Sequence, residues 1–65
     1  MATLAANLRR LRELAGLSCR ELDRRAGLGE GHTALIESGE RSNVQLTTLR
    51  ALAKALDAEL AELIT

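Results

Sequence analysis

The sequence predicts a single all-α domain, and three observations support this. Its 65 residues are 46% apolar but include no Phe, Tyr, Trp or Pro. Leu, Ala, Glu and Arg, which are strong helix formers, are common along the chain. Apolar residues recur three and four positions apart, as on one face of a helix, and no alternating strand pattern is present. These features predict five short helices.

The first helix is predicted to follow Thr3, whose hydroxyl can cap it. Its apolar stripe has spacings of four, three and four, through Leu4, Leu8, Leu11 and Ala15. Gly16 is expected to end the helix, because glycine readily adopts the left-handed conformation found there.

The segment "LSCREL" predicts the start of a second helix. Ser18 and Glu21 have capping-box spacing, in which each side chain bonds to the other residue's backbone. Leu17 and Leu22 flank them at the spacing of a hydrophobic staple. The helix is expected to run from Cys19 to Ala26 and to stop at Gly27.

A third helix is predicted from Glu30 to Ser38, between Gly29 and Gly39. Gly29 takes the cap position, for which glycine is acceptable. On this helix Thr33 and Ile36 are expected to face inward, and Leu35 to face outward.

A fourth helix and a final helical turn complete the chain. The fourth helix carries an apolar stripe at spacings of three and four, and Asp57 can adopt the left-handed turn after it. The stripe consists of Leu46, Leu49, Leu52, Ala53 and Leu56, and the last turn carries Leu60, Leu63 and Ile64. Two short helices joined by a glycine turn and packed by three others form a helix-turn-helix layout.

Composition excludes several function classes. The single Cys19 cannot form an internal disulfide, and one Cys with one His cannot build a zinc site. No catalytic constellation or phosphate-cradling glycine motif is present, so neither an enzyme nor a cofactor is expected. Without a signal peptide or membrane span, we expect a cytoplasmic protein.

Charge is unevenly distributed along a chain whose net charge is zero. Residues 1 to 25 hold six Arg against three acids, a net of +3, whereas residues 26 to 65 hold three bases against six acids, a net of −3. Such an uneven distribution of charge can give a neutral protein one face that attracts nucleic acid.

The segments "LRRLRELAGLSCRELDRRAGL" and "ALIESGERSNVQLTTLRALAKAL" resemble the phage repressor and Cro type of helix-turn-helix, the XRE family. The resemblance covers about Leu4 to Ile64 and implies one domain, residues 1–65, with its helix-turn-helix unit at about 18–38. It implies a transcriptional regulator, in particular a repressor, that binds duplex DNA as a homodimer with the third helix in the major groove.

The resemblance also implies site residues. Arg12 matches a phosphate-touching arginine that pairs with Glu37. The positions implied to face bases are Glu30, Gly31, His32 and Leu35. The positions implied to lie near phosphates are Arg12, Ser18, Cys19, Gly29, Arg41, Ser42 and Asn43.

Cys19 departs from the family, which usually has a phosphate-binding Gln there. A thiol is a weak donor, so we expect that contact to be lost. A helix N-terminus lowers a thiol's pKa, which leaves open a redox switch or simply a tolerated small residue.

Each candidate residue of the predicted recognition helix has two possible roles. Glu30 either accepts a bond from cytosine or stabilises the helix dipole. Gly31 inside a helix costs about 0.5–1 kcal/mol and either permits close approach or has no role. His32 contacts DNA or is inert, and Leu35 meets a thymine methyl or a protein partner.

Asp23 and Thr33 are polar where the family packs a small residue against an apolar one. A buried carboxylate is tolerable only if it is hydrogen-bonded. Our hypothesis is that Asp23 accepts a bond from the Thr33 hydroxyl or a nearby amide of the third helix. The alternative is that Asp23 extends into solvent.

A protein-interaction module on the same fold is the alternative function. It would use Leu35 with the small residues Gly31 and Ala34, and an exposed patch containing Leu14 and Leu35 would favour it. For a homodimer, the expected surface is Val44 to Thr65, around the last two helices.

Overall fold

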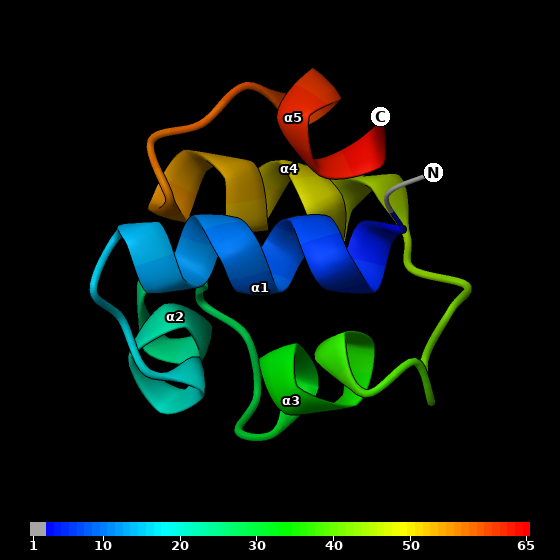
Figure 1. Ribbon diagram of the computed structural model, residues 1–65. Coiled ribbons are helices and arrows are strands. Elements are labelled where there is room, and N and C mark those ends of the chain that lie inside the picture. Colours follow the sequence, from blue (N-terminus) through cyan, green and yellow to red (C-terminus); the bar gives the residue numbers. More distant parts are fainter. Residues whose placement is uncertain (1–2) are drawn as a thin grey trace.

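The computed structural model describes residues 3–65, which form five helices and no strand (Figure 1). The all-α prediction is confirmed. In chain order the helices are α1 (Leu4–Leu14), α2 (Cys19–Ala26), α3 (His32–Glu37), α4 (Leu46–Ala55) and α5 (Leu60–Ile64).

The ends of α1 and α2 follow the predicted local chemistry. Thr3 Oγ1 accepts a hydrogen bond from the Ala6 amide at 3.1 Å. Ser18 and Glu21 form the reciprocal capping box, with distances of 3.1 and 2.9 Å. Gly27 ends α2 with a φ of 70°, in the left-handed conformation. These caps fix two helices by contacts local in sequence.

The predicted start of α3 was wrong. The helix begins at His32 rather than at Glu30, and its cap residue is Gly31 rather than Gly29. Gly31 has a φ of 94°, a conformation that L side chains rarely adopt. Glu30 therefore lies in the turn before the helix, and Gly31 is not an interior helix residue.

The final two helices lie close to their predicted positions. α4 ends at Ala55, Leu56 caps it, and Asp57 adopts the expected left-handed conformation with a φ of 54°. In α5, Leu63 is fully buried whereas Ile64 is exposed. The last turn thus contributes one leucine to the core.

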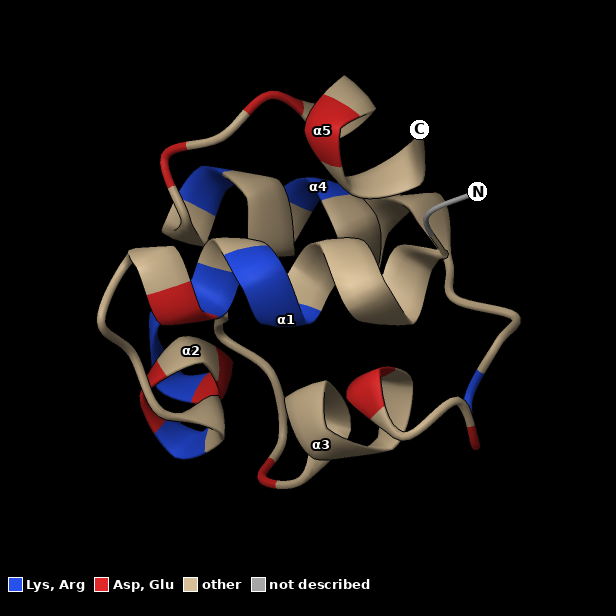
Figure 2. Cartoon of the chain, viewed as in Figure 1, with Lys and Arg blue, Asp and Glu red and all other residues tan. Residues whose placement is uncertain are grey.

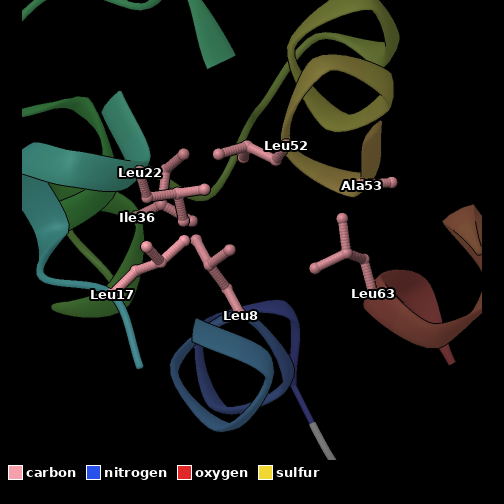
Figure 3. Close-up of a cluster of buried hydrophobic side chains, with 7 residues drawn as sticks. All are labelled: Leu8, Leu17, Leu22, Ile36, Leu52, Ala53 and Leu63. Carbon is pink, nitrogen blue, oxygen red and sulfur yellow. The ribbon is translucent and has the colours of Figure 1, made fainter. Parts of the chain in front are cut away.

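One apolar core joins all five helices (Figure 3). α1 packs against α3 and α5, while α2 packs against α3 and α4. In Figure 1, α1 crosses the middle of the molecule, with α2 and α3 on one side and α4 and α5 on the other. The buried apolar residues are Leu8, Leu17, Leu22, Ile36, Leu52, Ala53 and Leu63.

Three polar residues are buried with this core: Asn7, Asp23 and Thr33. The Asn7 side-chain amide donates to the Leu63 carbonyl at 2.8 Å and so ties α1 to α5. Within residues 3–65, every buried side-chain polar atom has a hydrogen-bond partner. These hydrogen bonds offset the cost of removing the polar groups from water.

The helices of residues 3–65 are too short, and insufficiently apolar, for any of them to cross a membrane.

Candidate nucleic-acid interface

The expected recognition helix, α3, lies at the edge of the molecule with one face on the core. Thr33 and Ile36 are buried, as predicted, and Ala34 is exposed. The loop after α3 contains Arg41, and α4 begins beyond it. α3 and this loop together form the candidate interface.

A shallow hollow lies between α3, the loop and the start of α4. Its lining consists of His32, Ile36, Arg41, Asn43, Val44, Gln45 and Thr48. The hollow brings His32, an expected base-facing residue, together with Arg41 and Asn43, which were expected near phosphates. Gln45 and Thr48 were not anticipated. Their position at the start of the fourth predicted helix could have indicated a phosphate contact, since free amides at a helix N-terminus can bind phosphate.

The expected base-facing residues lie on α3 and on the turn before it. Glu30 is exposed, whereas Gly31, His32 and Leu35 are half-buried. His32 begins α3, and its Nδ1 lies 3.1 Å from the Gly29 carbonyl oxygen. Leu35 is thus less exposed than its predicted outward position suggested.

Several expected phosphate-facing residues lie at helix ends or in the loop. Ser18 is exposed, although its hydroxyl accepts from the Glu21 amide in the α2 capping box. Gly29 is exposed in the turn before α3. Residues 41–43 (Arg41, Ser42 and Asn43) are exposed and lie in the loop between α3 and α4.

Arg12 joins α1 to α3 in the expected ion pair with Glu37. Its Nε and Nη2 donate to the two carboxylate oxygens at 2.6 and 3.0 Å, and Nη1 donates to the Leu17 carbonyl at 2.8 Å. The hydrogen bond to Glu37 is the main cause of a raised Arg12 pKa. All three guanidinium nitrogens are thus engaged within the protein, through three of the five N–H groups that an arginine carries. The pair with Glu37 is confirmed, and the phosphate contact of Arg12 stays a prediction.

Cys19 lies beside this pair, with Sγ 3.8 Å from Glu37 Oε2. Its pKa is raised, first by burial and then by the negative charge of Glu37, with Arg12 acting in the opposite direction. The expectation of a lowered thiol pKa at the helix start was therefore wrong. At neutral pH the thiol is protonated, which argues against a reactive redox switch.

Asp23 makes the contact proposed from the sequence, and more. Oδ1 accepts from the Thr33 hydroxyl at 2.6 Å and from the Thr33 amide at 2.8 Å. Oδ2 accepts from the Gly31 amide at 2.9 Å. The sequence hypothesis allowed a nearby amide without naming one, and the structure has two, those of Gly31 and Thr33.

Glu30 pairs with Arg20 of α2, with Oε1 and Nη2 3.3 Å apart on two strongly exposed side chains. This contact partly neutralises the acidic residue ahead of α3. Figure 2 shows blue segments concentrated on α1 and α2, while Glu37 is the acidic residue within α3. The negative charge of Glu37 is matched by Arg12, so the outer surface of α3 is less acidic than its sequence suggested.

Leu14 and Leu35 do not form the exposed pair that would favour a protein partner. Leu14, at the end of α1, is 75% exposed. Leu35 is half-buried and is not one of the large apolar residues exposed in residues 3–65. The observation that would support an interaction module is therefore missing from the described part of the chain.

Comparison with known proteins gives two findings that agree with this geometry. Residues 3–63 match the sequence model of a family described as "Helix-turn-helix domain". The crystal structure of the restriction-modification controller protein C.AhdI from Aeromonas hydrophila is similar, with a TM-score of 0.88 and 39% identity. That similarity covers 94% of this chain and 91% of the controller protein. A search of curated protein sequences returned no match.

Proposed function

We propose a specific mode of action for this chain. The chain belongs to the helix-turn-helix family of phage repressor and Cro type, and it is a DNA-binding transcription regulator. It binds duplex DNA as a homodimer, with α3 in the major groove, and represses by occupying a promoter. The observation that carries this proposal is the hollow where α3 meets the loop and the start of α4, because it places His32 beside Arg41 and Asn43.

Base contacts in this mode come from the start and outer face of α3. His32 and Leu35 are the side chains of α3 that we assign to base edges, with Leu35 suited to a thymine methyl. Glu30 precedes them in the turn, where its carboxylate accepts a bond from cytosine N4 or repels other sequences. Gly31 lets the turn adopt its left-handed conformation beside the groove.

Phosphate contacts come from groups flanking α3. Arg41, Ser42 and Asn43 line one side, and the α4 start adds the side chains of Gln45 and Thr48. Arg12, Ser18 and Gly29 supply further contacts, from α1 and from the starts of α2 and α3, whereas the Cys19 thiol is too weak a donor to replace the family's Gln. Few of these groups are cationic, so the salt dependence of binding should be shallow, about 0.9 in logarithmic slope for each phosphate neutralised.

Selection of bound duplexes from a random-sequence library, at low salt, tests the proposal. Enrichment of a palindrome is expected, together with weaker binding after His32→Ala or Leu35→Ala. A matched control is Ala6→Ser, an exposed position on α1 outside both the expected DNA interface and the expected dimer surface. A folded protein that enriches no motif would contradict DNA recognition and would direct attention to a protein partner.

Similarity to a restriction-modification controller protein supports the regulatory part of this proposal, because it covers nearly the whole of both chains at 39% identity. The helix-turn-helix regulators are a non-enzymatic kind of protein, and we assign this chain no catalytic role. Its partner is duplex DNA together with a second copy of the chain.

A further inference from the structure

The start of α3 has no capping side chain of its own. Its cap residue is glycine, and the helix is six residues long. The first amide groups of a helix have no partner within the helix and must find acceptors elsewhere. For α3 those acceptors come from a different helix.

Asp23 of α2 supplies them. Its carboxylate accepts from the amides of Gly31 and Thr33, which are the cap residue and the second helical residue. A capping side chain normally bonds to the amide of the second or third helical residue. Asp23 therefore caps the start of α3 from a neighbouring helix, whereas Ser18 caps α2 from the residue just before it.

A third hydrogen bond to Asp23 adds direction to this cap. The Thr33 hydroxyl donates to Oδ1 at 2.6 Å, within a site where Asp23 is 2% and Thr33 0% exposed. Three donors from two residues fix the carboxylate plane relative to α3. A pair of apolar side chains would fill the same space without imposing an orientation.

The far end of α3 is held as firmly. Glu37 is its last residue and accepts two bonds from Arg12 of α1. α3 is thus attached to α2 at its beginning and to α1 at its end. Two separate anchors fix both the position and the tilt of a helix that is too short to be stable alone.

We propose that Asp23 is a positioning residue for DNA recognition, which fixes the start of α3 and so the angle at which its outer face enters the major groove. This inference rests on the proposed function, because it assigns α3 to DNA. Asp23 itself is buried and contacts no base.

The test compares Asp23→Asn with Thr33→Val and a control, Leu63→Val, which loosens the core at α5. The dissociation constant is measured for the duplex that the native protein selects. Circular dichroism first establishes that every variant is folded, and sedimentation equilibrium that every variant associates like the native protein, because Leu63 lies on α5 of the expected dimer surface. Asp23→Asn should raise it about tenfold or more, because an Asn amide cannot accept from all three donors. It should also reduce discrimination against a duplex altered at one contacted base pair.

Thr33→Val removes only the hydroxyl bond and should raise the dissociation constant by a smaller factor, about threefold. Thr33→Ser should restore native binding, and Leu63→Val should not weaken it. Equal affinities and equal discrimination for Asp23→Asn and the native protein would overturn the proposal. So would a loss in Leu63→Val as large as the loss in Asp23→Asn.

Amide hydrogen exchange, measured by NMR without DNA, separates this inference from the proposed function. Asp23→Asn should speed exchange at Gly31 and Thr33 while leaving the amides of α1 protected. If the native protein selects no duplex, the proposed function fails, and with it the role of Asp23 in recognition, whatever the exchange shows. If the native protein binds but exchange at Gly31 and Thr33 is unchanged, only the positioning role fails.

Discussion

Arg12 and Glu37 link the first helix to the last residue of the third through two N–H···O bonds. Their side chains are 14% and 10% exposed, so the pair is largely removed from water. Arg12 also donates to the Leu17 carbonyl, which leads into α2. One guanidinium therefore connects three consecutive helices around the candidate interface.

Breaking this pair should strongly destabilise the domain. Arg12→Lys loses the two-pronged geometry, and Glu37→Gln leaves the guanidinium without a counter-charge, so each should lower the free energy of unfolding by about 2–3 kcal/mol. Urea unfolding followed by circular dichroism gives the values, and a double-mutant cycle gives the coupling. Arg9→Lys is the matched control, because its 3.7 Å pair with Glu13 is exposed. Coupling near zero between Arg12 and Glu37 would contradict a structural role.

Gly29 and Gly31, which lie just before His32, should respond differently to substitution by alanine. Gly31→Ala should cost about 1–2 kcal/mol, because its φ of 94° is left-handed although open space surrounds the new methyl group. Gly29→Ala should be close to neutral, since its Cβ would lie 3.4 Å from His32 Nδ1, near ordinary contact. Thermal unfolding of both variants measures the difference. Equal destabilisation would mean that α3 begins earlier than at His32.

Cys19 should react slowly with iodoacetamide at neutral pH. Its raised pKa leaves less thiolate than a free cysteine has at the same pH, and the thiolate is the nucleophile. The rate should increase as pH rises past the usual range for thiols, and it should reach the free-cysteine rate when urea unfolds the chain. Mass spectrometry follows the modification. Faster reaction in the folded protein than in urea would restore the case for a redox-sensitive thiol.

Glu21 should make stability depend on pH in the acid range. Its folded-state pKa is held below the ordinary value of 4.5 by the bonds from Ser18, so the ionised form stabilises the fold. That contribution is complete above the unfolded pKa and disappears as pH falls through the lower folded value. Glu21→Gln should therefore show a weaker acid dependence of the urea midpoint. Parallel pH profiles for the two proteins would exclude this effect.

The proposed homodimer should depend on apolar side chains at the end of the chain. Leu46 and Ile64 are 51% and 56% exposed within the expected surface around α4 and α5. Leu46→Asp or Ile64→Asp should shift sedimentation equilibrium towards the monomer, because burying a new carboxylate in the interface is costly. Leu14→Asp changes an even more exposed leucine, on α1, and should leave association unchanged. Dissociation by Leu14→Asp alone would place the interface on α1.

Local sequence signals predicted most of the fold because most helix ends are capped by neighbours in sequence. Thr3, Ser18 with Glu21, and Asp57 each act within a few residues, and each has the expected conformation. Asn7 was missed although it lies on the Leu4–Leu8–Leu11 stripe, because its partner is a carbonyl 56 residues away.

The site was harder to predict, and α3 shows why. Gly29 and Gly31 are both acceptable caps by local rules, and the one that caps α3, Gly31, donates its amide to Asp23 of another helix. Similarly, the pKa of the Cys19 thiol is raised first by burial and then by the charge of Glu37, and local sequence rules reveal neither. Helix periodicity did identify the inward positions Thr33 and Ile36.

The external cap on α3 limits how this helix can be reused. A synthetic peptide with the sequence of α3 would lose the carboxylate that receives its first amides and should be unfolded in water. Grafting its outer face onto another helix-turn-helix scaffold would require Asp23 and Thr33 to be transplanted with it. Under the proposed function, recognition is therefore portable only together with both anchors of α3, Asp23 of α2 and Arg12 of α1. A change of target sequence is most readily made at positions that leave these anchors intact.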